Sequence, residues 1–282
     1  MQNSIKRLFY FPLIGFFIYA CNPQKVNQPV SSAPEELALP PAEVQKNIRE
    51  AFPNAVPSSQ FADSLYQYMQ DRYGIFPKDI LLGISICVDD IIYSKNFRRH
   101  PEMKGPFHIG GLGGLPFSGV SGLNAYAHHV PDNGAMLLLI GPHIGYSYEK
   151  GWGYMLRPGQ HEGSSCCGAL VGTLGSLEKG NIKAVPPDED DYQGGKLAQL
   201  ALAHSNEILT SRNPLIEFTK ITSIEAEAQI DRMLPKVSLE HERFVIAVGL
   251  ILINTDYNYV DYISVTHFKV FDVKTRKYLE EK

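Results

Sequence analysis

The chain has 282 residues, of which 44% are hydrophobic, and this is enough for one large folded domain with a substantial core. Its formal net charge of -4 at pH 7, without a basic cluster, argues against nucleic acid as a partner. No stretch beyond residue 20 is long and apolar enough to cross a membrane.

Residues 1–20 have the features of a signal peptide. The basic pair Lys6-Arg7 precedes an apolar run over residues 8–20, which is too short to span a bilayer. The run ends in Ile18-Tyr19-Ala20-Cys21, which resembles the lipobox of bacterial lipoproteins. We therefore expect a lipid on Cys21 that anchors the protein to a membrane of the bacterial cell envelope, facing the periplasm or the cell exterior. The alternative is an ordinary secretory signal or an anchor helix.

Residues 21–41 are rich in Pro, Ser, Gln and Asn and are expected to form a flexible tether. The remainder, residues 42–282, is predicted to be one α/β domain. Apolar residues at three- and four-residue spacing predict helices over residues 44–52, 59–73, 197–209 and 223–233. The sequence Thr222-Ser223-Ile224-Glu225 has the pattern of a capping box and predicts the start of the last of these helices.

Two apolar runs, over residues 79–86 and 135–140, are typical of buried strands in a parallel sheet. Cys87-Val88-Asp89 follows the first run, and His143 follows the second after a Gly-Pro turn. Open α/β sheets bind ligands at the carboxyl ends of their strands, so these side chains are expected to face one crevice if the strands are neighbours.

A third candidate ligand, Cys167, precedes small residues that predict a helix running to about residue 179. Two thiolates and an imidazole are ligands that zinc prefers, and three protein ligands leave a fourth position for water. Cys87, His143 and Cys167 are therefore a candidate zinc site. A disulfide that involves Cys87 is an alternative use of the thiols. A thiol hydrolase with Cys167 as nucleophile and His143 as base is another.

The rest of the chain completes an α/β pattern. Residues 244–253 are expected to form a central strand, and residues 262–271 a last edge strand. The predicted fold is a mainly parallel sheet flanked by helices, with a C-terminal edge strand. The glycine-rich run over residues 105–122 does not meet the GxGxxG pattern and no strand directly precedes it, so nucleotide binding is not expected.

Several short motifs, in this order, resemble the limiting-CO2-inducible protein B/C family, whose members are related to β-class carbonic anhydrases. The resemblance spans roughly residues 76–271. The motifs are Cys87-Val88-Asp89, Gly141-Pro142-His143-Ile144-Gly145, Arg157-Pro158-Gly159-Gln160, Ser165-Cys166-Cys167-Gly168-Ala169, Ile253-Asn254-Thr255 and Asp261-Tyr262.

The resemblance implies a β-carbonic-anhydrase-like fold, a homodimer, and zinc held by the three candidate ligands. It also implies reversible hydration of CO2 to bicarbonate by a zinc-bound hydroxide, with Asp89 beside the fourth metal position. The β-class pairs this aspartate with an arginine two residues later, where the present chain has Ile91. Arg157 is the candidate that would take this arginine's place. The alternative is a non-catalytic exported lipoprotein with a structural zinc or a disulfide.

The adjacent thiols Cys166 and Cys167 can be ranked. Cys167 matches the Cys-Gly-Ala of the family pattern. Neighbouring residues that enter a helix point about 100° apart, and therefore seldom bind one small ion together. We expect Cys167 to be the ligand and Cys166 to be dispensable for metal binding.

Overall fold

The computed structural model describes residues 37–90, 100, 102–183 and 186–282. The predicted signal peptide, the lipidation site Cys21, most of the tether and Ile91 lie outside these residues. Residues 37–282 form one compact unit. Within the described part of the chain, no helix has both the length and the hydropathy that a bilayer span requires.

Among the described residues, nine strands form one sheet, in the order β1-β10-β9-β4-β2-β3 with β5, β6 and β11 attached to this path. The neighbours β3, β2, β4 and β9 are parallel, whereas β10 is antiparallel to β9, β1 and β11. A separate antiparallel pair joins β7 to β8. The strands are β1 (Val56–Pro57), β2 (Ile80–Ile86), β3 (Lys104–His108), β4 (Ala135–Gly141), β5 (His143–Ser147), β6 (Gly151–Trp152), β7 (Tyr154–Met155), β8 (Ser164–Ser165), β9 (Phe244–Thr255), β10 (Tyr262–Asp272) and β11 (Lys277–Glu281).

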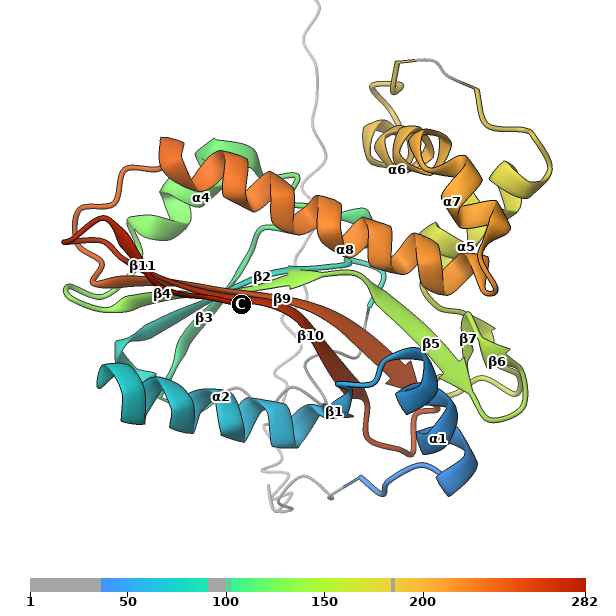
Figure 1. The fold of residues 1–282 in the computed structure, drawn as a ribbon, viewed down its shortest axis with the longest axis horizontal. Helices are drawn as coiled ribbons and strands as arrows, with labels where there is room; N and C mark the ends of the chain where they lie inside the picture. The colour runs from blue at the N-terminus through green and yellow to red at the C-terminus, as the bar shows by residue number, and fades with distance from the viewer. Residues whose placement is uncertain (1–36, 91–99, 101, 184–185) are drawn as a thin grey trace, which may run out of the picture. The chain divides into compact units, whose positions relative to one another are not determined.

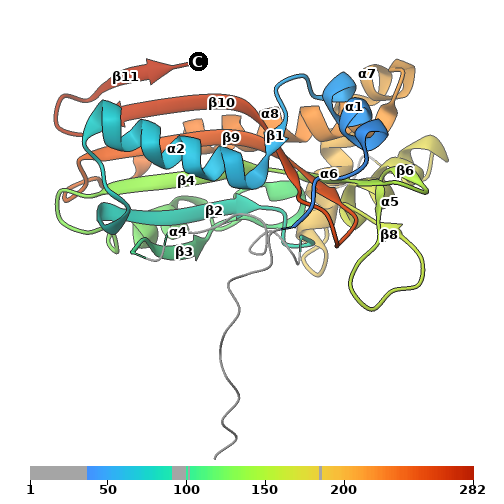
Figure 2. The same cartoon turned by 90° about the horizontal axis from the view of Figure 1, so that it is seen from below.

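Helices cover both faces of the sheet. Figure 1 shows α4 and α8 over one face and α2 over the other, and Figure 2 shows α2 lying along the strands, with α1 towards the end of the sheet where β6 lies. The helices are α1 (Ala42–Ala51), α2 (Ser58–Tyr73), α4 (Gly119–Ala127), α5 (Gly168–Glu178), α6 (Tyr192–Ala203), α7 (Ser205–Thr210) and α8 (Pro214–Met233), with short 3-10 turns η1 (Pro77–Asp79), η2 (Leu112–Gly114) and η3 (Leu234–Lys236).

The apolar run of β4 is buried throughout because side chains of a strand alternate between the two faces of the sheet. Leu137 and Leu139 belong to the core beneath α2, together with Leu65. Met136 and Leu138 belong to the core on the opposite face. A strand covered by helices on both faces needs this continuous apolar sequence, which is why the sequence pattern located it correctly.

His143 begins a strand of its own, β5, immediately after β4. Pro142 lacks an N–H group, and the backbone of Gly141 has φ +151, with no room for a Cβ beside the carbonyl of Leu250. The ladder breaks at this point and then resumes with unchanged register, so β4 and β5 pair successively with the single long strand β9. This break is where the sheet places the candidate metal ligand.

The predicted start of the long helix α8 was wrong. The helix begins at Pro214, and the side chain of Asn213 caps it by accepting a hydrogen bond from the N–H of Ile216. Thr222 is instead buried in the helix interior, where its hydroxyl donates to the carbonyl of Phe218. The Asn-Pro pair was the true N-terminal signal.

Two further predicted elements differ in detail. The C-terminal edge strand exists, but it is β11, whereas the strand predicted at the edge is β10 and pairs on both sides. The single helix predicted over residues 197–209 is two helices, α6 and α7, which meet at His204 with non-helical backbone (φ -111, ψ 18).

Candidate metal centre

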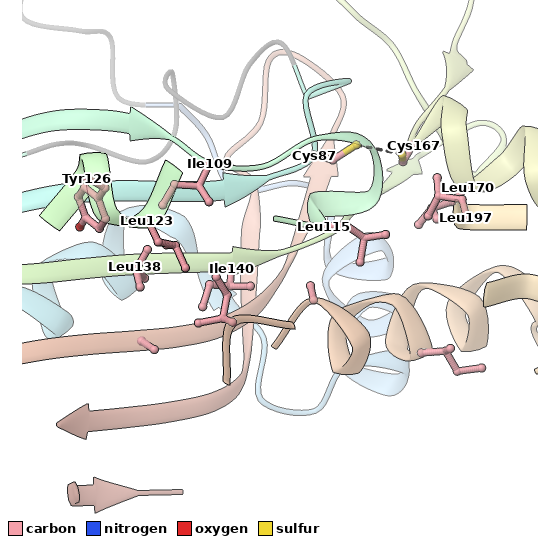
Figure 3. Close-up of a cluster of buried hydrophobic side chains, with 14 of the residues drawn as sticks. Cys87, Ile109, Leu115, Leu123, Tyr126, Leu138, Ile140, Cys167, Leu170 and Leu197 are labelled. Atoms are coloured by element: carbon pink, nitrogen blue, oxygen red, sulfur yellow. Dashed lines mark hydrogen bonds between the residues drawn. The ribbon is translucent and has the colours of Figure 1, made fainter. Parts of the chain in front are cut away.

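The structure brings the three predicted ligands together. Cys87 follows β2, His143 begins β5, and Cys167 immediately precedes α5. All three residues are buried, and their ligand atoms lie within 4.8 Å of one another. Figure 3 shows Cys87 and Cys167 facing each other beside the labelled core residues Leu115 and Leu170.

The two thiols lie within hydrogen-bond distance of each other. The Sγ atoms of Cys87 and Cys167 are 3.4 Å apart, and the backbone N–H of Gly113 donates to Cys87 Sγ over 3.2 Å. The hydrogen bond from Cys167 lowers the pKa of Cys87 to about 4. The same bond, together with burial, raises the pKa of Cys167 well above its usual range. A metal ion bound here would displace the proton of each coordinating thiol.

Gly113 was part of the glycine-rich run that had no assigned role in the sequence analysis. It adopts the left-handed conformation (φ +66), which glycine tolerates best, within the turn η2. This turn directs its N–H at the Cys87 sulfur. The run thus supports a metal-ligand candidate, which a search for phosphate-binding loops could not reveal.

The imidazole of His143 is held at one nitrogen only. Its Nδ1 lies 2.7 Å from Oδ1 of Asn254, whereas its buried Nε2 has no hydrogen bond to the described residues. Burial alone would lower the pKa of His143, but its interactions with the neighbouring thiols of Cys166 and Cys167 outweigh burial and raise this pKa. A buried nitrogen without a hydrogen bond, next to two thiols, is a favourable position for a metal ion.

The chemistry of these donors fits zinc. Two sulfurs and one imidazole nitrogen are a set that zinc prefers, and the cluster supplies three ligands, as catalytic zinc sites do. Cys87, Cys166 and Cys167 are free thiols rather than partners in a disulfide.

Asp89 lies beside the cluster. Its Oδ2 is 3.9 Å from His143 Nε2 and accepts a 2.5 Å hydrogen bond from the N–H of Gly168. That N–H belongs to the first turn of α5, where helix N–H groups lack partners within the helix. Gly168 permits the approach, because a Cβ there would lie 3.0 Å from the carboxylate oxygen.

Arg157 is engaged elsewhere in the described structure. Its guanidinium donates to Oγ of Ser164 over 2.5 Å and to the carbonyl of Ser165 over 3.0 Å. No hydrogen bond or ion pair joins it to Asp89 in the described part of the chain. These contacts hold the segment that leads to Cys166. That Arg157 acts as the partner of Asp89 stays a prediction.

Cys166 is buried on the other side of the imidazole. Its Sγ lies 3.5 Å from His143 Nδ1 and 3.5 Å from Asn254 Oδ1. It therefore contacts the nitrogen that is already hydrogen bonded, and it is not a member of the three-residue cluster.

Asn254 and Asp261 are functional candidates to which sequence analysis assigned no role. Asn254 Nδ2 donates to Asp261 Oδ2 over 3.1 Å, and both residues are fully buried. Both residues belong to motifs of the family resemblance, and Asn254 is a polar residue near the end of a long apolar strand. Nothing local could show that its partner is His143, which is 111 residues away.

The fold and the cluster define an α/β protein with a candidate metal site of two thiols and an imidazole. The sequence model of the limiting CO2-inducible proteins B/C beta carbonic anhydrases matches residues 55–272. The chain belongs to this family, and carbonic-anhydrase-like character is therefore shown at the family level. No curated protein matches the sequence.

Solved structures agree with this assignment. The crystal structure of PtLCIB4, a homolog of the limiting CO2-inducible protein LCIB, superposes with a TM-score of 0.73 at 25% identity, covering 84% of this chain and 99% of that one. The crystal structure of LCIB itself gives a TM-score of 0.64 at 18% identity, covering 85% and 99%, which shows likeness of fold alone.

Proposed function

We propose that this protein is a zinc-dependent carbonic anhydrase that converts CO2 and water to bicarbonate, with zinc held by Cys87, His143 and Cys167. The observation that carries the proposal is the buried His143 Nε2, which has no hydrogen bond to the described residues and lies beside two thiols of complementary chemistry. Membership of the family supports the reaction, and the donor set supports the metal.

When bound, zinc would supply Lewis-acid activation of a water molecule at near-neutral pH. Asp89 would accept a hydrogen bond from that water and orient it, because its carboxylate faces the cluster at 3.9 Å from His143 Nε2. The N–H of Gly168 fixes the carboxylate in this position. The protein thereby restricts the orientation of the nucleophile, which is the contribution that preorganised sites make to rate.

The surroundings of the thiols suit an apolar gas. Cys87 and Cys167 belong to a buried cluster that also contains Leu115, Ile140 and Leu170 (Figure 3). These side chains exclude water and would give CO2 a dry wall beside the nucleophile. Arg157 would contribute from the neighbouring segment, in place of the arginine that the β-class carries near its aspartate.

The direct test is stopped-flow CO2 hydration by the full chain loaded with one equivalent of zinc. Activity that exceeds the uncatalysed rate and is lost in Cys167→Ser supports the proposal. Zinc-loaded, folded protein without activity contradicts it and favours the second candidate, a structural zinc in a non-catalytic protein.

The thiol hydrolase is less compatible with the arrangement of the side chains. It gives no role to Cys87, whose Sγ lies 3.4 Å from Cys167 Sγ, or to Asp89 beside the cluster. A lack of burst kinetics with activated esters would exclude this alternative.

We further propose that the chain is lipid-anchored through Cys21, acts in the bacterial cell envelope and forms a homodimer. The lipobox-like sequence supports the anchor, and the family resemblance supports the dimer. Cys21→Ser should release the protein from the membrane fraction. Recovery of the native protein from the cytoplasm would contradict the lipid anchor. A monomer in sedimentation analysis would contradict the homodimer.

A further inference from the structure

The amide of Asn254 is hydrogen bonded at both of its ends. Its Oδ1 lies 2.7 Å from Nδ1 of His143. Its Nδ2 donates to Oδ2 of Asp261 over 3.1 Å and to Oδ1 of Asp90 over 3.4 Å. An amide has one accepting and one donating end, so the two carboxylates require the NH2 group on their side. The oxygen must then face the imidazole.

This orientation determines the tautomer of the neutral His143 imidazole, which is the form that binds a metal. A nitrogen that faces a carbonyl oxygen must carry a hydrogen, and in a neutral imidazole the other nitrogen then has the lone pair. The other nitrogen is Nε2, which has no hydrogen bond to the described residues and lies on the side of Cys87 and Cys167. The polarity of the Asn254 amide thus makes Nε2 the nitrogen available to a metal.

Asp261 is itself fixed in place. Its Oδ1 accepts a 2.8 Å hydrogen bond from the backbone N–H of Thr255, and the residue is fully buried. One carboxylate oxygen is thereby committed to the backbone of β9 and the other to the amide of Asn254. The line of bonds runs from the main chain through two side chains to the imidazole.

We propose that Asn254 and Asp261 are a positioning pair: Asp261 sets the orientation of the Asn254 amide, and that amide selects the nitrogen of His143 that binds metal. The inference rests on the zinc site of the proposed function and extends it to two residues that do not touch the ion. Outer partners of metal-binding histidines typically contribute about 10- to 100-fold in metal affinity.

Asp261→Asn tests whether Asp261 sets the orientation of the Asn254 amide, because asparagine has nearly the same shape as aspartate but carries an NH2 group. The new amide would set an NH2 group against either the backbone N–H of Thr255 or the NH2 of Asn254. Reorientation of Asn254 would then present a donor to Nδ1 and move the imidazole proton to Nε2. We expect zinc affinity to fall by about 10- to 100-fold.

The exchanged pair, Asn254→Asp with Asp261→Asn, restores the pattern when it is combined with Asp90→Asn, so that no carboxylate faces the new aspartate at position 254. The carboxylate at position 254 would accept from both His143 and the amide at position 261, so most of the lost zinc affinity should return. A purely structural role predicts no such rescue. Asp256→Asn is the matched control, because Asp256 is a buried carboxylate that accepts the N–H groups of Tyr148 and Leu156 and has no hydrogen bond to His143.

The experiment measures zinc dissociation constants of the full-length variants by competition with a chromophoric chelator. Cadmium-113 coupling in protein labelled with nitrogen-15 histidine identifies the bound nitrogen. The proposal is supported if zinc affinity falls in Asp261→Asn, returns in the exchanged pair and is unchanged in Asp256→Asn. It also requires that cadmium couples to Nε2 of His143 in the wild type.

Wild-type affinity in Asp261→Asn, or coupling to Nδ1 in the wild type, would overturn it. If Asp261→Asn does not fold, the zinc affinity of the exchanged pair and the cadmium coupling in the wild type test the proposal instead. Neither readout uses catalysis, so a protein that binds zinc through Nε2 but does not hydrate CO2 would refute the proposed function and leave this inference standing.

Discussion

The long strand β9 pairs with two successive strands, and the two halves of this ladder differ in what their buried side chains require. Against β4, its residues 244–249 face the apolar residues 135–140. Against β5, its residues 252–255 face a segment that begins with His143. Both halves are buried, so burial does not distinguish them.

The difference lies in hydrogen bonding. In the first half, side chains contribute volume, and a residue of similar size would serve nearly as well. In the second half, the imidazole of His143 and the amide of Asn254 form a directional pair, and the loss of one partner leaves the other buried and unsatisfied. The single strand β9 therefore supports a core that tolerates substitution at one end and a site that depends on specific hydrogen bonds at the other.

The largest expected effect is loss of the metal ligands. His143→Ala or Cys167→Ser should abolish zinc binding and CO2 hydration, because each removes one of three donors. Cys166→Ser is the matched control and should retain zinc and most activity. Metal analysis after gel filtration measures both. The reverse pattern, with Cys166 essential and Cys167 dispensable, would contradict the proposed ligand set.

The apolar half should respond in stability rather than in chemistry. Leu138 is fully buried between β2 and β9, so Leu138→Ala should reduce the free energy of unfolding by about 2–5 kcal/mol. Zinc content per folded chain should stay at one. Urea denaturation and metal analysis check this, and loss of zinc from the folded variant would break the comparison between the two halves.

Asp89 should affect the rate without affecting the metal. Asp89→Asn is expected to lower kcat/KM for CO2 by about 10²-fold, the lower end of general acid–base contributions, with zinc bound as in the wild type. Stopped-flow hydration and a zinc competition assay separate these quantities. An equal loss of zinc would show that Asp89 acts as a ligand in the resting protein.

The smallest effect is expected far from the site, at the C-terminal edge. Glu280 on β11 accepts hydrogen bonds from Tyr68 and Tyr73 of α2, over 2.6 Å and 2.7 Å, and pairs with Lys282. Burial alone would raise the pKa of Glu280, but these partners lower it to about 2. The charged partner Lys282 is 70% exposed, and a glutamine at position 280 could still accept from both tyrosines, so Glu280→Gln should lower stability by about 1 kcal/mol or less.

The sign of its pH dependence follows from the lowered pKa. The stabilisation is fully present above the ordinary glutamate value of 4.5 and is lost as the pH falls from there towards about 2. The stability difference between wild type and Glu280→Gln should therefore shrink between pH 5 and pH 3 in urea titrations. A difference that grows on acidification would refute this.

Sequence reasoning succeeded where the signal is local. Uninterrupted apolar runs marked β2 and β4 and thereby placed Cys87 and His143 at strand boundaries, and the structure brings both together with Cys167. It missed β11, which is short, largely exposed and without an apolar pattern. It also misplaced the start of α8, because a capping-box pattern inside the helix competed with the true signal at Asn213.

The supporting residues of the site could not be predicted in the same way. Gly113, Asn254 and Asp261 act through contacts made by distant segments. Their role depends on which end of a side chain faces which neighbour. That information exists only in the folded chain.

The ligands come from segments that are far apart in sequence, since Cys167 lies 80 positions after Cys87. An unfolded chain rarely brings such segments together, because closing a long loop costs entropy. Zinc would therefore bind the folded protein almost exclusively and stabilise it by mass action, by about 2.7 kcal/mol at a free concentration one hundred times the dissociation constant. The lifetime of the protein in its compartment would then depend on the zinc supply there, and metal scarcity would reduce its abundance as well as its activity.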